Sequence, residues 1–243
     1  MGNIIQSSWM KSTYRPKDAH FSVTDLCMPT CQLWAKAHTA FEEENTVKTV
    51  GFKSFLGASL HKAIESQDED GVVKEFSWVR QLEDGTKIGG TADELRWRYS
   101  IKKWRLGDIK LKTDFSARKF LGIGTKSNPN PKPEQEKEQL QMSMYRWLFE
   151  GLFDIEDKGV IYLFTPGWVS YYPYPEMQEV WLDLLPISTI DTYIKGKLSV
   201  IKQDKQPPKD CPDWLCGYCQ FNEVCKYYTT PQEKCFKEFG DER

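Results

Sequence analysis

The chain has 243 residues, of which 40% are hydrophobic and 28% are charged, proportions that are ordinary for a soluble globular protein with one core. No stretch approaches the roughly 20 apolar residues of a membrane span, and residues 1–18 lack the apolar run of a signal peptide, so a cytoplasmic protein without a membrane partner is expected. Seven cysteines in a reducing compartment favour metal ligation over disulfide bonds, while the net charge of −2 conceals a local basic segment.

Two helices are predicted before the first strand. In residues 21–41, Ser and Thr offer capping side chains, Leu26 and Leu33 recur at broadly helical spacing, and Pro29 is expected near a helix start. Residues 54–66 place their large apolar side chains on related faces of a second helix.

After residue 70 the spacing of apolar residues changes to the alternation that is typical of β-strands. Residues 72–82 and 87–99 are joined by the turn sequence "EDGT" and predict an antiparallel hairpin. Residues 102–112 alternate in the same way and predict a third strand.

The second half of the chain alternates between helices and strands, which predicts an α/β protein. Residues 114–136 are rich in Gly, Pro, Asn and Lys and are expected to form a long loop. The remaining predicted elements are a helix over 136–153, strands over 159–166 and 177–185, a helix over 187–202, and a linker over 203–210.

A basic segment with interleaved aromatic residues covers residues 96–112, where seven Lys or Arg residues accompany a single acid, Asp108. Such a stripe is typical of a surface that meets nucleic acid, and an equally ordinary interpretation is a strand edge protected by solvated lysines. The residues predicted to bind nucleic acid are Arg96, Arg98, Lys102, Lys103 and Arg105.

Two carboxylates and a lysine in the predicted hairpin region form the main chemical motif. Asp108 and Lys110 must point the same way because alternate residues of a strand share a face. Asp93 lies on a nearby strand and is expected to converge with Asp108. Oxygen ligands of this kind hold Mg²⁺ or Mn²⁺, which keep positions open for water and phosphate oxygens.

The order of motifs along the chain extends this pattern. "HKAIE" on a predicted helix comes first, "GTADEL" and "GDIK" follow on strands, and "QMSMY" lies on the next helix. From "SVTDLCMPTCQLW" to "CGYCQFNEVC", nearly the whole chain resembles the RecB-like, iron–sulfur branch of the PD-(D/E)XK nuclease superfamily. This branch includes CRISPR-associated exonucleases, the nuclease domain of AddB-type recombination enzymes and related phage proteins.

The resemblance implies a fold and a site. The fold would be a single nuclease domain over residues 1–243, with a mixed central sheet flanked by helices and a C-terminal segment that binds an iron–sulfur cluster. Residues 20–50 would form an N-terminal helical part that supplies one cluster cysteine, 51–202 the nuclease core, and 203–243 the cysteine segment. The implied metal ligands are His61, Asp93, Asp108 and the carbonyl of Ile109, and the implied catalytic residues are Asp93, Asp108, Lys110, Gln141 and Tyr145.

Three cysteines near the C-terminus, Cys216, Cys219 and Cys225, have the spacing C-x2-C-x5-C and leave most metal sites one ligand short. The resemblance implies a [4Fe-4S] cluster whose fourth ligand comes from near the N-terminus, with Cys31 favoured over Cys27. A local four-thiolate zinc site that includes Cys211 is the alternative, and Cys235 is expected to be a spare thiol.

The resemblance therefore implies a metal-dependent deoxyribonuclease, an exonuclease that acts on single-stranded DNA ends with 5′ to 3′ polarity favoured. Its partners would be DNA and proteins of recombination or CRISPR adaptation, and its cofactors a [4Fe-4S] cluster and Mg²⁺ or Mn²⁺. An endonuclease within a larger complex is one alternative, and a catalytically inactive nucleic-acid-binding module with a structural cluster is another.

Overall fold

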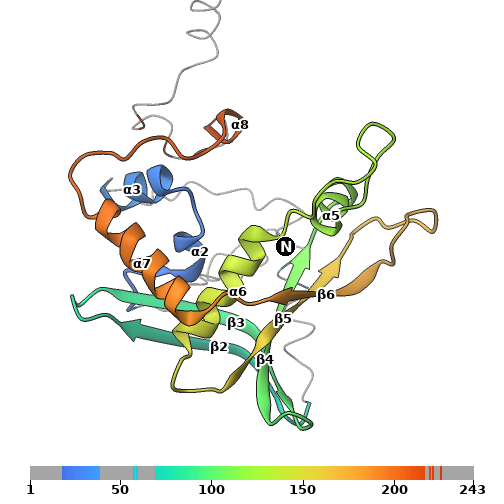
Figure 1. The fold of residues 1–243 in the computed structure, drawn as a ribbon, viewed down its shortest axis with the longest axis horizontal. Helices are drawn as coiled ribbons and strands as arrows, with labels where there is room; N and C mark the ends of the chain where they lie inside the picture. The colour runs from blue at the N-terminus through green and yellow to red at the C-terminus, as the bar shows by residue number, and fades with distance from the viewer. Residues whose placement is uncertain are drawn as a thin grey trace, which may run out of the picture. The chain divides into compact units, whose positions relative to one another are not determined.

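The computed structural model describes residues 18–38, 57, 59, 69–216, 219, 221 and 225. Its centre is a six-stranded mixed β-sheet (Figure 1). The strands are β1 (Phe21–Ser22), β2 (Val72–Gln81), β3 (Lys87–Arg98), β4 (Lys103–Leu111), β5 (Ile155–Phe164) and β6 (Met177–Asp183). They follow the order β1-β3-β4-β5-β6, and β2 also pairs with β3.

The sheet is mixed because its connections differ in length. Short turns join β2 to β3 and β3 to β4, and both pairs are antiparallel. The first turn uses Gly85 at a φ of +82°, and the second has Lys102 at a φ of +53°. A long crossover separates β4 from β5, which run parallel, and β6 returns antiparallel to β5.

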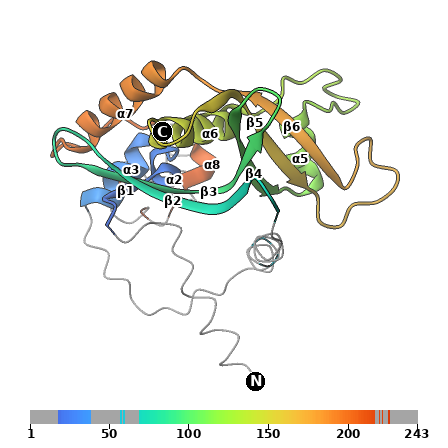
Figure 2. The ribbon, with the colours of Figure 1, turned by 90° about the horizontal axis from the view of Figure 1, so that it is seen from below.

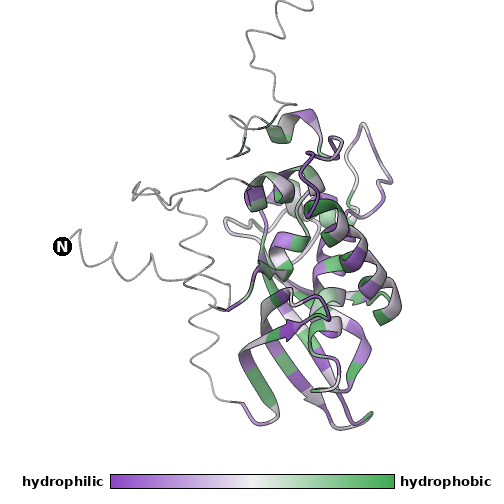
Figure 3. Cartoon of the chain, turned by 90° about the vertical axis from the view of Figure 1, so that its left-hand side faces the viewer, coloured by the Kyte–Doolittle hydropathy of each residue, from purple (hydrophilic) through white to green (hydrophobic). Residues whose placement is uncertain are grey.

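The helices are α2 (Val23–Leu26), α3 (Thr30–His38), α5 (Asp114–Leu121), α6 (Glu136–Leu148), α7 (Ile187–Ile201) and α8 (Asp213–Cys216). α6 packs against β2, β3 and β4, and α2 lies on the same face of the sheet (Figure 2). The core between them contains fully buried side chains such as Leu95, Leu106, Met144 and Leu148. Hydrophilic and hydrophobic residues alternate along the strands, as expected when each strand has one face on a core (Figure 3).

The prediction of an α/β fold with a mixed sheet flanked by helices is confirmed. The expected loop over 114–136 is wrong in its first part, which forms α5. The helix is stabilised by Asp114, whose carboxylate accepts a hydrogen bond from Arg118 one turn later, and it ends at Gly122 in the left-handed conformation (φ +68°). β5 begins at Ile155, ahead of the predicted 159, because the polar residues at its start hide the strand pattern.

The N-terminal prediction also needs correction. A single helical pattern over 21–41 proves to be α2 and α3, separated before Pro29. α2 is begun by a capping box in which Ser22 and Asp25 each accept a hydrogen bond from the other's backbone N–H. The helix predicted over 54–66 lies outside the described residues apart from Gly57 and Ser59.

The chain divides into two compact units. One lies within Met1–Cys27 and Lys48–Thr192 and contains the whole sheet, and the other lies within Met28–Val47 and Tyr193–Arg243. In the described part of the chain, no helix combines the length and the apolar composition needed to cross a membrane.

Candidate active site and cysteine pocket

The predicted carboxylates and lysine of the first unit come together on β3 and β4. Asp108 is only 3% exposed, and the ammonium of Lys110 lies 2.9 Å from its Oδ2 and 3.1 Å from its Oδ1. Asp93 reaches across from β3, where its Oδ2 accepts a hydrogen bond of 2.7 Å from the backbone N–H of Ile109. The antiparallel pairing of Glu94 with Gly107 accounts for this meeting, since it brings Asp93, the residue before Glu94, beside Asp108, the residue after Gly107.

Lys110 keeps its positive charge at neutral pH. Burial alone would lower the pKa of its ammonium, but the negative charge of Asp108, with smaller contributions from Asp93 and Glu138, outweighs burial and raises the pKa above the ordinary lysine value. A fixed positive charge therefore stands beside the two carboxylates.

One carboxylate oxygen of the site is placed where it could accept a cation. Oδ2 of Asp108 is buried and, among the described residues, accepts no hydrogen bond of good geometry, with the ammonium of Lys110 as its neighbouring donor group. A divalent cation would satisfy that oxygen, and hard oxygen ligands suit Mg²⁺ or Mn²⁺. Among residues with described positions, no three His, Cys, Asp or Glu side chains form a complete metal site, and His61 lies outside the described residues.

α6 contributes a tyrosine to the same region. Gln141 donates a hydrogen bond of 3.3 Å from Nε2 to Oη of Tyr145, which is 5% exposed. Burial, followed by the negative charges of Asp108 and Asp93, raises the pKa of Tyr145 well above its ordinary value. The hydroxyl is therefore neutral at physiological pH and can donate a hydrogen bond beside the carboxylates.

Two further residues belong to this site, although sequence reasoning did not identify them. Glu138 lies one helical turn before Gln141 and is buried, and its Oε1 is 2.6 Å from the ammonium of Lys112. Two signals could have indicated them. Lys112 shares the strand parity of Asp108 and Lys110, and Glu138 precedes Gln141 at a spacing of three on α6.

The predicted basic stripe is only partly exposed. Arg105 is 7% exposed, and its guanidinium carbon lies 4.9 Å from the ring centre of Trp181, while Arg96 is paired with both Glu69 and Glu94. Arg105 is therefore buried on the sheet, and the guanidinium of Arg96 is already held by two carboxylates, so neither matches the predicted exposed stripe.

Three residues of the stripe remain, all near the β3–β4 turn. Lys102 is exposed within the turn. Lys103 is 41% exposed and lies 3.5 Å from Asp154, and the guanidinium carbon of Arg98 lies 5.8 Å from the ring centre of Trp181.

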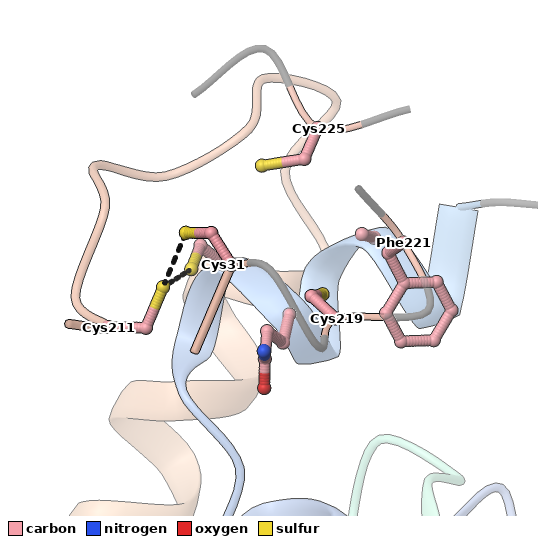
Figure 4. Close-up of a pocket in the computed structure, with 8 residues that line it drawn as sticks. Cys31, Cys211, Cys219, Phe221 and Cys225 are labelled. Atoms are coloured by element: carbon pink, nitrogen blue, oxygen red, sulfur yellow. Dashed lines mark hydrogen bonds between the residues drawn. The ribbon is translucent and has the colours of Figure 1, made fainter. Parts of the chain in front are cut away.

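Five cysteines line one pocket in the second unit (Figure 4). Cys31 is on α3 and Cys216 is on α8, and the three others are Cys211, Cys219 and Cys225. Backbone N–H groups at the start of α3 bind Asp210, with 2.6 Å from Thr30 and 3.1 Å from Cys31, which joins segments 180 residues apart. Cys27 lies in the first unit and is not part of this pocket, and Cys235 is outside the described residues.

Cys211 contacts two of the other thiols. Its Sγ lies 3.7 Å from Sγ of Cys31 and 3.9 Å from Sγ of Cys216. Two thiolates on one tetrahedral ion with bonds of about 2.3 Å would be about 3.8 Å apart, whereas a cluster places each thiolate on a different iron and holds the sulfurs farther apart. The two observed distances therefore match thiolates that share one ion, and they place Cys211 beside Cys31 and Cys216, two of the predicted cluster ligands.

Burial raises the pKa of Cys31, and it raises the pKa of Cys211 to about 12 with further contributions from Cys31 and Cys216. These two thiols are therefore protonated at neutral pH, and a metal would have to displace their protons on binding.

No family model matches the chain, and no curated protein matches it. Among solved structures, the one titled "Crystal structure of SSO0001" superposes with a TM-score of 0.59 at 19% sequence identity, over 95% of this chain and 98% of that chain. At this identity the likeness concerns the fold alone. The chain therefore has a mixed α/β fold, with a six-stranded sheet flanked by helices, that a solved structure shares over nearly its whole length.

Proposed function

We propose that this protein is a metal-dependent deoxyribonuclease of the RecB-like branch of the PD-(D/E)XK superfamily, acting as an exonuclease on single-stranded ends with 5′ to 3′ polarity. One observation carries the proposal: the buried Asp108 has Lys110 against its carboxylate and Asp93 beside it on the neighbouring strand. The buried carboxylate of Asp108 next to the half-buried Asp93 costs free energy unless cations compensate the pair, and Lys110 supplies only one positive charge.

The reaction would be hydrolysis of a phosphodiester bond. Asp93 and Asp108 would hold Mg²⁺ or Mn²⁺, with His61 as a further proposed ligand, and the ion when bound lowers the pKa of its water and offsets charge on the phosphate. Lys110, kept protonated by Asp108, would orient the attacking water or stabilise the negative charge that grows on the phosphate oxygens. Tyr145 would donate its neutral hydroxyl, held in place by Gln141.

We further propose that the cysteine pocket holds a [4Fe-4S] cluster through Cys31, Cys216, Cys219 and Cys225. The presence of all four thiols in the lining of one pocket, which does not include Cys27, supports this ligand set. The short contacts of Cys211 favour zinc as the competing occupant. Iron, sulfide and zinc contents of protein purified without air separate the two.

DNA would approach the accessible part of the basic stripe, which is reduced to the exposed Lys102 and its half-buried neighbours Arg98 and Lys103. Phosphate contacts release counterions, so binding should weaken steeply with salt, and Lys102→Glu should lower the salt slope by about 1 or more. An unchanged slope would identify these residues as a solvated edge. Recombination or CRISPR-adaptation proteins are the partners that we propose for such an enzyme.

The nuclease proposal is tested with end-labelled single- and double-stranded oligonucleotides incubated with Mg²⁺, Mn²⁺ or a chelator. Shortening from the 5′ end of single strands, abolished by the chelator and by Asp108→Ala, is the expected result. Asp183→Ala and Lys158→Ala are matched controls, because these side chains are 83% and 60% exposed on β6 and β5. Binding without any cleavage, under all metal conditions, would refute the proposal.

A further inference from the structure

Two large aromatic side chains of the first unit are unusually exposed. Phe115 on α5 is 70% exposed, and Tyr171 in the loop between β5 and β6 is 80% exposed. An exposed aromatic ring forfeits most of the free energy that its burial would provide, so neither ring contributes much to the stability of the fold. Figures 1 and 2 both place α5 and this loop at the same end of the sheet.

Contacts beneath the two rings hold α5 and the loop together. Tyr174 is buried and donates a hydrogen bond of 2.6 Å to Asp114 at the start of α5. Arg118 bonds the same carboxylate, and its guanidinium carbon lies 5.6 Å from the ring centre of Tyr172, which in turn contacts the ring of Tyr171. The exposed rings are therefore presented on an ordered base.

Positive charge accompanies the rings. The ammonium of Lys119 lies 5.1 Å from the ring centre of Phe115 and is shared with Glu134 at 3.4 Å. Arg118 stands under Tyr172, and the exposed Lys126 follows in the next loop. An aromatic face with cations beside it is complementary to a nucleic-acid strand, which offers flat bases and negative phosphates.

The rings lie just beyond the proposed catalytic site. β4 carries Asp108 and Lys110 and ends at Leu111, and α5 begins at Asp114, so Phe115 follows Lys110 by five residues. Leu111 pairs with Phe164, the last residue of β5, from which the loop with Tyr171 departs. Phe115 and Tyr171 thus follow the C-terminal ends of β4 and β5. Asp108 and Lys110 lie near this same end of β4.

We propose that Phe115 and Tyr171 form a stacking platform for the unpaired bases of a single-stranded nucleic acid, with Lys119 and Arg118 beside its phosphates. This inference rests on the proposed function and names the residues that would select single strands, whose bases are free to stack. A duplex offers its bases only in the grooves, so it gains little from exposed rings.

The test measures fluorescence anisotropy of a labelled single-stranded oligonucleotide with the full chain, with chelator present so that no cleavage occurs. Phe115→Ala and Tyr171→Ala should each weaken binding roughly fivefold to a hundredfold, the equivalent of one lost base stack. Tyr171→Phe should retain wild-type affinity, whereas Tyr171→Leu, which keeps apolar area but loses the ring, should not. Trp78→Ala is the control, because Trp78 is an exposed aromatic residue (42%) on β2, outside both the platform and the basic stripe.

An abasic oligonucleotide of the same length should bind the wild type and both alanine variants equally. Equal affinities of all variants for the normal strand would overturn the platform, as would an equal loss on the abasic strand. A changed sedimentation coefficient with unchanged DNA binding would assign the rings to contact between copies and would also overturn it. Because this assay measures binding alone, the loss in Phe115→Ala and Tyr171→Ala tests only the platform, whereas the separate cleavage assay with Asp108→Ala tests only the nuclease.

Discussion

Replacing Gly90 by alanine tests the packing that places α6, and with it Tyr145, over the sheet. A Cβ added at Gly90 would lie 2.8 Å from Cε1 of Tyr145, 3.0 Å from Val23 and 3.1 Å from Leu148, and all three neighbours are buried. Carbon atoms prefer separations of about 3.5–4.0 Å, so α6 would have to move outward by roughly 1 Å. Overpacking of this kind costs about 1–3 kcal/mol of unfolding free energy.

The measurement is the unfolding free energy from urea denaturation of the full chain, with cleavage assayed on the same samples. Gly90→Ala should lower the denaturation midpoint and reduce cleavage, because the displaced helix carries Tyr145 away from the carboxylates. Gly196→Ala is the matched control: its Cβ meets nothing within 4 Å in α7, and the change should stabilise by about 0.5–1 kcal/mol through helix propensity. Equal stability of Gly90→Ala and the wild type would refute the described contact between α6 and β3.

Three further outcomes are expected. Asp108→Ala and Lys110→Ala should each abolish cleavage while retaining oligonucleotide binding, since both act on charge at the phosphate; measurable cleavage by either would remove it from the site. Asp93→Ala should weaken Mn²⁺ binding in a calorimetric titration, and an unchanged affinity would exclude Asp93 as a ligand. Protein purified without air should lose iron and colour in Cys31→Ala and keep both in Cys27→Ala, and the reverse pattern would transfer the fourth ligand to Cys27.

Features that depend on local periodicity could be predicted from the sequence. The strand alternation that put Asp108 and Lys110 on one face is a local property, and the two side chains do meet. Glu138 escaped prediction because a glutamate on an amphipathic helix has the pattern of an ordinary solvated residue, and only the fold buries it against Lys112.

Two other differences have their own physical reasons. α5 was hidden because its polar composition resembles that of the loop that follows it, although its Asp–Arg pair and terminal glycine are helix signals. The position of Cys211 next to Cys31 depends on a contact across 180 residues, which no local pattern encodes.

The hydrogen bonds between Asp210 and the start of α3 have a consequence for how the protein matures during synthesis. The second unit is assembled from one stretch near the beginning of the chain and another that leaves the ribosome about 180 residues later. At synthesis rates of about 5–20 residues per second, the other cysteines of the pocket are synthesised roughly 10–40 s after Cys31. During that interval the sheet of the other unit can already fold, so we expect the thiol pocket to be completed, and any metal to be inserted, as the last step of maturation.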